Sequence, residues 1–183
     1  VLINIRERLQ NAGIEDFEYE SWAFLDWKLH IDRAEFYMNP NGEVKEELLA
    51  ELESVLKQRE QRVPLQYLMG ECEFMGYDFY VDERVLIPRQ DTECLVELAV
   101  EDIRNRKTQN RCESNNTADQ KNEQKVKVLD LCTGSGCIGI SVAKLCPDTE
   151  VTLADISEGA LSVAKKNAQN LDAGVTLILS LIH

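Results

Sequence analysis

The sequence predicts an α/β protein with a small N-terminal helical bundle, a β-hairpin connector and a parallel sheet flanked by helices. Apolar side chains recur at helical spacing between residues 4 and 62, and residues 71–81 switch to a strand pattern around a glycine. Residues 126–179 then alternate strand, helix, strand, helix and strand. With 183 residues, 44% of them hydrophobic, the chain can form one large domain or two small ones.

Composition and charge exclude several classes of protein. The 33 acidic side chains outnumber the 20 basic ones, and the formal net charge of −13 argues against a direct nucleic-acid partner. No apolar run reaches membrane length and the start of the chain has no leader pattern, so we expect a cytoplasmic protein without a membrane partner. The six cysteines form no CxxC pair and only two histidines are present, which indicates reduced thiols and no metal site.

Residues 1–63 are expected to form the helical domain. Between Val44 and Leu56, apolar residues recur every three or four positions, with glutamates on the opposite face of the helix. Upstream, apolar and aromatic residues from Ile5 to Tyr37 indicate two or three shorter helices. We interpret these aromatic side chains as core residues rather than as the lining of a ligand pocket.

Residues 64–90 are expected to form the connector. Pro64 ends the preceding helix because proline cannot continue it. The segments 71–74 and 77–81 have strand character and flank Gly76, which predicts a two-stranded hairpin with a glycine turn.

Residues 91–183 are expected to form a partial α/β domain that opens with a helix. Residues 104–125 contain almost no apolar side chain, so we predict a mobile polar loop there. The alternation that follows predicts a parallel sheet with right-handed crossovers. The expected strands are 126–131, 150–155 and 175–179, and the expected helices are 138–145 and one that begins after Ser157.

The turn after the first of these strands carries the chemistry. Glycines at 134 and 136 allow a sharp turn and let a ligand approach the backbone. Asp155 follows Gly136 by 19 residues and ends the second strand, where a carboxylate can accept both hydrogen bonds of a ribose diol. Together these features indicate an adenosine-containing cofactor. The candidate cofactor-binding residues of this region are Asp130, Cys132, Thr133, Gly134, Ser135, Gly136 and Asp155.

The residues leave three interpretations of this turn. The glycines at 134, 136 and 139 also satisfy the GxGxxG pattern of dinucleotide binders, so NAD is an alternative cofactor. Asp130 favours S-adenosylmethionine, because a carboxylate there repels a pyrophosphate but accepts a hydrogen bond from an ammonium group. A glycine turn that binds nothing is the third interpretation, and it requires separate packing reasons for each of the acidic and glycine residues.

Four segments, in a specific order, carry a family resemblance. They read RVPLQYLMG at 62–70, FMG at 74–76, VLIPRQDTE at 85–93 and LDLCTGSGCI at 129–138. Together they resemble the release-factor glutamine methyltransferases (PrmC/HemK), and the resemblance covers nearly the whole chain except the polar loop. The chain departs from the family pattern at Gln90, where proline is common, and at Cys132, where methyltransferases often have glycine.

The resemblance implies a Rossmann-like methyltransferase domain, of which this chain contains the first half. The implied reaction transfers a methyl group from S-adenosylmethionine to the glutamine side-chain amide in the Gly-Gly-Gln motif of peptide-chain release factors. The resemblance implies that Cys132 to Gly136 line the methionine part of the cofactor and that Asp155 binds its ribose. Arg89 and Thr92 lie near the amino-acid end of the cofactor. We expect residues 1–63 to dock the protein substrate.

The family's Asn-Pro-Pro-Tyr motif, which binds the substrate amide, does not occur in this sequence. We therefore assign no catalytic residue and expect an inactive fragment. We also expect this fragment to self-associate through an exposed first strand, and a full-length form to be a monomer. The alternatives to a methyltransferase are an NAD-dependent oxidoreductase and a non-catalytic module that binds a partner.

Overall fold

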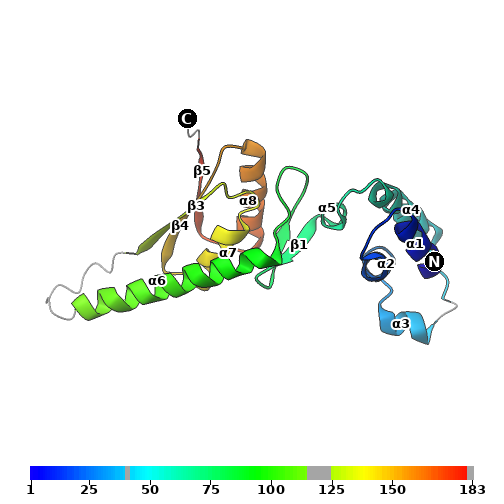
Figure 1. The fold of residues 1–183 in the computed structure, drawn as a ribbon, viewed down its shortest axis with the longest axis horizontal. Helices are drawn as coiled ribbons and strands as arrows, with labels where there is room; N and C mark the ends of the chain where they lie inside the picture. The colour runs from blue at the N-terminus through cyan, green and yellow to red at the C-terminus, as the bar shows by residue number, and fades with distance from the viewer. Residues whose placement is uncertain (40–41, 115–124, 181–183) are drawn as a thin grey trace. The chain divides into compact units, whose positions relative to one another are not determined.

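The computed structural model describes residues 1–39, 42–114 and 125–180, and the chain divides into two compact units at Met69 and Gly70. The first unit is helical, and the second contains a hairpin and a parallel sheet with helices, as Figure 1 shows. The predicted fold class is confirmed. Among the helices within the described ranges, none combines the length and the apolar character needed to cross a membrane.

The first unit buries the apolar stripes of its helices against one another. Leu2, Ile5 and Leu9 lie on one face of α1 and contact a core that includes Phe24 and Leu56. This core accounts for the aromatic and aliphatic spacing in the sequence. The helices are α1 (Leu2–Asn11), α2 (Phe17–Phe24), the π-helical turn η1 (Leu25–Leu29), α3 (Arg33–Met38), α4 (Glu46–Glu60) and α5 (Leu65–Met69).

Two arginines tie α4 into this unit. The guanidinium of Arg59 donates to both carboxylate oxygens of Glu20, at 2.7 and 2.9 Å, and both side chains are largely buried. The guanidinium of Arg8 donates to Glu53 and Glu60 on α4 and holds the pKa of both carboxyls below its usual range. Part of the acidic character of this unit is therefore neutralised internally.

The hairpin belongs to the second unit and is not a separate connector. Its strands β1 (Glu71–Phe74) and β2 (Tyr77–Tyr80) pair antiparallel. Phe74 and Phe79 are completely buried in the same core as the helices that flank the sheet. The segment predicted at 64–90 is thus divided, because α5 lies in the first unit and the hairpin lies in the second.

The helix after the hairpin is longer than the sequence indicated. A 3₁₀ turn η2 (Gln90–Thr92) leads into α6 (Glu93–Ser114). The predicted polar loop at 104–125 is therefore wrong for residues 104–114, and residues 115–124 lie outside the described part of the chain. An ion pair one helical turn apart, Arg106 with Asp102 at 2.7 Å, stabilises this part of the helix without burial.

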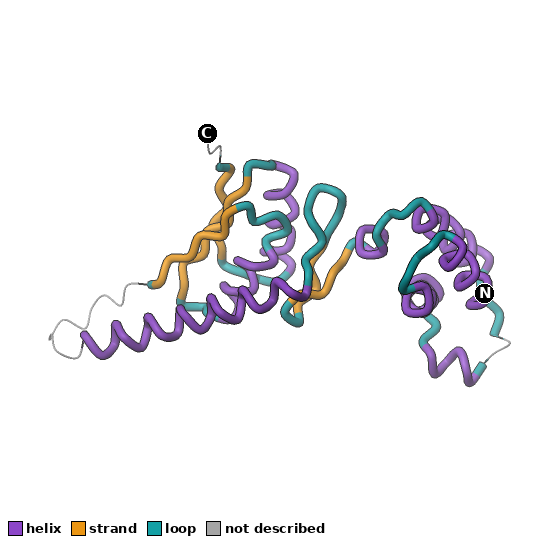
Figure 2. The backbone as a smooth tube through the Cα atoms, in the orientation of Figure 1, coloured by secondary structure: helices purple, strands orange, loops and turns teal. Residues whose placement is uncertain are grey.

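The sheet of the second unit is parallel, with the order β3-β4-β5. Its strands are among the orange segments in Figure 2. Val128, Val151 and Val175 lie side by side across its three strands. Strand and helix positions agree with the sequence prediction to within one residue. The elements are β3 (Val126–Leu131), α7 (Cys137–Leu145), β4 (Thr149–Asp155), α8 (Glu158–Asn170) and β5 (Val175–Leu179).

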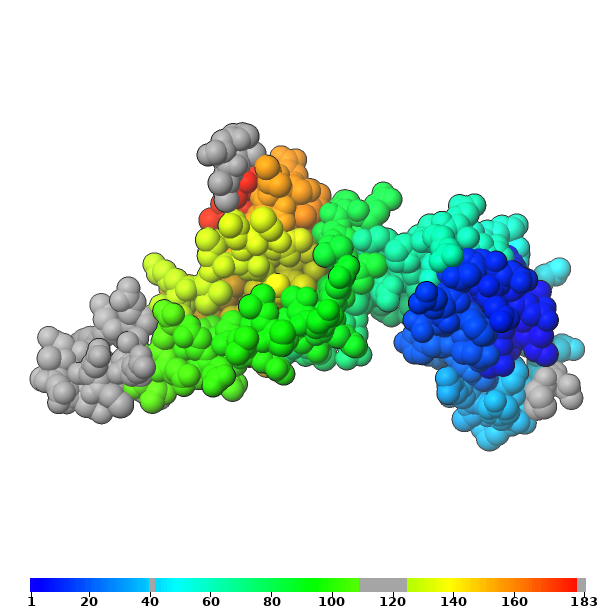
Figure 3. Space-filling view, in the orientation of Figure 1, coloured from blue at the N-terminus to red at the C-terminus, as the bar shows by residue number. Residues whose placement is uncertain are grey.

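The helices of this unit pack against one face of the sheet. Alternate side chains of β3, β4 and β5 join the core beneath α6, α7 and α8, and α6 contacts α7 along the green and yellow surfaces in Figure 3. The opposite face exposes 63% of Leu129, 49% of Leu131 and 48% of Ile178. The described residues therefore leave one apolar face of the sheet open.

Candidate functional site

The turn between β3 and α7 has a backbone that few residues adopt. Cys132, Gly134 and Gly136 have φ angles of 61°, 56° and 82°, all in the left-handed region. The amide of Gly136 donates to the carbonyl of Thr133 at 2.8 Å, and the amide of Thr133 donates to the carbonyl of Ala154 on β4 at 3.0 Å. The turn is thus closed on itself and fastened to the neighbouring strand.

The glycines of this turn have different roles. A Cβ added to Gly134 meets no heavy atom within 4 Å, so this position faces open space that a ligand can use. A Cβ at Gly136 comes within 2.7 Å of Ile140 and 3.2 Å of Ala164, and one at Gly139 collides with Leu153. The second and third glycines therefore allow close packing of α7, α8 and the sheet.

Asp155 braces the turn from the end of β4. One of its carboxylate oxygens accepts from the amide of Gly134 and the other from the amide of Ser157, both at 2.9 Å. The side chain is buried, with 9% exposed. Because a carboxylate oxygen can accept more than one hydrogen bond, both oxygens retain capacity for hydroxyl donors of a ligand.

Asp130 lies beside the same turn. Its Oδ2 accepts from the hydroxyl of Thr133 at 2.7 Å and from the amide of Gly139 at 2.9 Å. Burial raises the pKa of Asp130, and the neighbouring charge of Asp155 adds to this effect. The two carboxylates make the site acceptor-rich, which suits ligand hydroxyl and ammonium groups.

Cys137 opens α7 next to this pair and is not poised for nucleophilic chemistry. Burial raises the pKa of its thiol to about 11, so the thiol stays protonated at neutral pH. Cys132, by contrast, is exposed on the turn. The five cysteines with described side chains are free thiols. Within the described ranges, His, Cys, Asp and Glu side chains form no group that could hold a metal ion.

Hydrogen bonds join several of the residues that the sequence singles out, and leave others apart. Asp130 with Thr133, and Asp155 with Gly134, are linked directly. Ser135 is buried, and its carbonyl accepts a hydrogen bond from α8. Arg89 is exposed and Thr92 is half-buried, and neither side chain forms a hydrogen bond or ion pair with another described residue. Their role near the amino-acid end of a cofactor remains a prediction.

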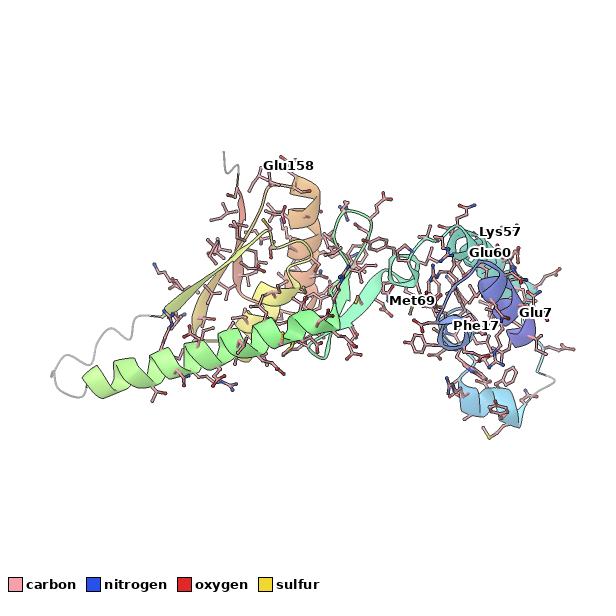
Figure 4. The ribbon with its side chains drawn as sticks, viewed as in Figure 1. Glu7, Phe17, Lys57, Glu60, Met69 and Glu158 are labelled. Carbon is pink, nitrogen blue, oxygen red and sulfur yellow. The ribbon has the colours of Figure 1, made fainter. Side chains whose placement is uncertain are left out.

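Asn167 is a residue of this region that sequence reasoning missed. Its side-chain nitrogen donates to the carbonyl of Ser135 at 2.8 Å from the last turn of α8, the helix that begins at the labelled Glu158 in Figure 4. The sequence does contain a feature that could have identified Asn167. It is a polar residue on the apolar face of a predicted helix, next to Ala164 and Ala168. Such a position requires hydrogen-bond partners in the core.

Two of the amides that could bind a phosphate here already donate to carboxylates. In dinucleotide sites, amides at a helix N-terminus bind the pyrophosphate. Here the amides of Gly134 and Gly139 donate to the carboxylates of Asp155 and Asp130. Two carboxylates beside these amides also repel an anionic group. The geometry therefore favours a ligand with hydroxyl and cationic donors over a pyrophosphate.

Two domain families match the chain. Residues 1–70 match the PrmC N-terminal domain, whose end falls within one residue of the boundary between the two units. Residues 116–180 match the methyltransferase small domain, which covers the sheet and the candidate site.

Curated relatives match nearly the whole chain. A release factor glutamine methyltransferase of Clostridium acetobutylicum is 38% identical over 171 residues, which cover 93% of this chain and 54% of that protein. One from Geobacter sulfurreducens is 35% identical over 94% of this chain and 54% of its own length. The chain spans about half the length of these relatives. A solved tRNA (uracil-54, C5)-methyltransferase of Pyrococcus abyssi aligns with a TM-score of 0.43 and 17% identity, over 60% of this chain and 23% of that one.

Proposed function

We propose that this chain, which belongs to the release factor glutamine methyltransferase family, provides the S-adenosylmethionine site of an enzyme that methylates a glutamine side-chain amide of peptide-chain release factors. Within the candidate site, one observation supports the proposal most directly. The Asp155 carboxylate at the end of β4 braces the turn at Gly134, whose outer side is open. Relatives of this name over nine-tenths of the chain support the substrate class.

The residues at the turn fit the cofactor. Asp155 has acceptor capacity for the two ribose hydroxyls, and Asp130 offers an acceptor and a negative charge for the ammonium group. Gly134 leaves space for the backbone to approach the chain that links these two groups. When bound, S-adenosylmethionine supplies an electrophilic methyl group on a sulfonium.

The chain's own contribution is to bind and orient. The turn is held by hydrogen bonds at Thr133, Gly134 and Gly136, so little reorganisation is needed when a ligand arrives. Both carboxylates are partly removed from water, which strengthens their attraction for a cationic ligand. We assign no catalytic residue in this chain, because the sequence contains no Asn-Pro-Pro-Tyr motif to bind the substrate amide.

Two alternatives make different predictions. An NAD-dependent oxidoreductase requires turn amides that can bind a pyrophosphate, and the amides of Gly134 and Gly139 already donate to carboxylates. A non-catalytic binding module requires no cofactor affinity at all.

The proposal is tested by calorimetric titration of the chain with S-adenosylhomocysteine. We expect Asp155→Ala to weaken binding about tenfold to a hundredfold, because a charge-assisted hydrogen bond contributes roughly 1.5–3 kcal/mol. Gly134→Val should weaken it as strongly, because the side chain enters the open space and cannot relax at a positive φ. Glu150→Ala removes an exposed carboxylate from the opposite end of β4 and serves as the matched control. Unchanged affinity in both site variants would refute the assignment.

We assign docking of the release factor to the helical unit, residues 1–69. Its match to the PrmC N-terminal domain and its separate core support this role. Because acidic side chains outnumber basic ones in this unit, we expect it to contact basic or apolar patches on the release factor. We expect this contact in the cytosol, where translation terminates. A chain without residues 1–69 should lose affinity for a release factor while still binding S-adenosylhomocysteine. Equal release-factor affinity with and without this unit would exclude the docking role.

A further inference from the structure

Asn167 is completely buried, and all the hydrogen atoms of its side-chain amide are used. Its Oδ1 accepts from the backbone amide of Tyr80 at 2.7 Å. Its Nδ2 donates to the carbonyl of Tyr80 at 2.9 Å and to the carbonyl of Ser135 at 2.8 Å. An amide without such partners is costly to bury, so the three bonds explain why a polar residue is tolerated here.

On one side, Asn167 holds the hairpin. Tyr80 ends β2, and the amide group of Asn167 pairs with its backbone N–H and C=O as a neighbouring strand would. Lys166, the preceding residue of α8, places its ammonium 3.1 Å from the centre of the Tyr80 ring. The end of the hairpin is therefore fixed to α8 through both its backbone and its side chain.

On the other side, Asn167 holds the glycine turn. Ser135 is 2% exposed, and its carbonyl is fixed by the second hydrogen of the Asn167 amide. The next residue, Gly136, closes the turn through its amide and packs close to Ala164, which lies on the same face of α8 as Asn167. This hydrogen bond therefore determines how the peptide between Ser135 and Gly136 is oriented.

We propose that Asn167 is a positioning residue that sets the glycine turn against the end of the hairpin. Through Thr133 the same turn is also bonded to Asp130, the acceptor proposed for the ammonium group, so the orientation of the turn affects how the amino-acid part of the cofactor is held. This inference rests on the proposed function, because its consequence is selective binding of the amino-acid part of the cofactor. The adenosine part depends mainly on Asp155, which Asn167 does not contact.

The test uses two ligands that share adenosine and differ in the amino-acid part, S-adenosylhomocysteine and 5′-methylthioadenosine. We expect Asn167→Leu to weaken binding of S-adenosylhomocysteine tenfold or more and binding of 5′-methylthioadenosine less than threefold. Asn170→Leu makes the same substitution at an exposed position of α8 and should change neither affinity more than twofold. An equal loss for both ligands, or no loss for either, would show a purely structural role and overturn the proposal.

Hydrogen exchange without ligand separates this inference from the proposed function. If the unmodified chain binds neither ligand, the proposed function fails, and exchange at the turn amides of residues 134–136 still tests the positioning role. Exchange at least tenfold faster in Asn167→Leu than in Asn170→Leu supports it, and equal exchange overturns it. If Asn167→Leu does not fold, Asn167→Ala is measured in its place, with Asn170→Ala as its control, because alanine removes the donor to Ser135 without adding volume or charge.

Discussion

Asp130 illustrates how single residues trade stability for binding at this site. Its carboxylate is partly buried and close to Asp155, so the charged form is disfavoured and its pKa is raised. A carboxyl whose pKa is raised in the folded protein stabilises the fold below its unfolded pKa, and this contribution is lost as pH rises through the folded value. When this carboxyl is ionised its charge is therefore a cost to the fold, and the proposed binding of a cationic group offsets this cost.

We predict that affinity for S-adenosylhomocysteine increases as pH rises through the raised pKa of Asp130 and then levels off, because the ligand ammonium favours the ionised carboxylate. Asp130→Asn should weaken binding and remove this pH dependence. It should leave thermal stability at neutral pH equal or higher, since an amide oxygen can still accept from Thr133 and Gly139. Calorimetry across pH and thermal melts check both parts. A pH dependence that persists in the variant would assign it to another group.

At the residue level, the sequence predicted those features of the site that depend on the spacing of residues along the chain. The positions of Gly134 and Gly136 and the distance to Asp155 identify a turn and an acceptor at adjacent strand ends. The sequence could not reveal that Asp130 and Asp155 accept from the turn's own amides, or that Asn167 reaches Ser135. These contacts join residues 9 to 32 positions apart, and they depend on how α7, α8 and the turn pack against the strands.

At the scale of elements, the apolar patterns in the sequence predicted the strands correctly but did not predict the polar end of α6. The strands at 126–131 and 175–179 have the bounds that their apolar runs predict. In α6, however, Ile103 is the last buried residue among those up to Thr108, the part of the helix whose burial is described. Beyond it the helix is stabilised by propensity and by ion pairs such as Arg106 with Asp102, which a search for apolar periodicity does not detect.

The open face of the sheet leads to a prediction about association. Leu129 lies on β3, an edge strand within the described part of the sheet, and is 63% exposed next to Leu131. Exposed apolar side chains on an edge strand favour pairing with another chain. We expect the chain to self-associate with rising concentration in sedimentation velocity, and Leu129→Lys to reduce this association. Leu98→Lys, at a leucine of α6 that is 62% exposed, is the matched control. A monomer at all concentrations would contradict the expectation.

At the scale of the whole molecule, the two units have separate cores and separate proposed tasks. The core of the first unit is helical and contains no residue of the candidate site. The second unit contains the hairpin, the sheet and the hydrogen bonds described above that shape the glycine turn. Cofactor binding should therefore depend on residues 70–183, and substrate docking on residues 1–69.

The most direct test of the cofactor assignment is calorimetric titration of the intact chain, at neutral pH, with S-adenosylhomocysteine and separately with NADH. The acceptor-rich turn, with its amides donating to Asp130 and Asp155, predicts saturable one-site binding of S-adenosylhomocysteine and no binding of NADH. Binding of NADH without binding of S-adenosylhomocysteine, or the absence of binding by both ligands, would contradict this account.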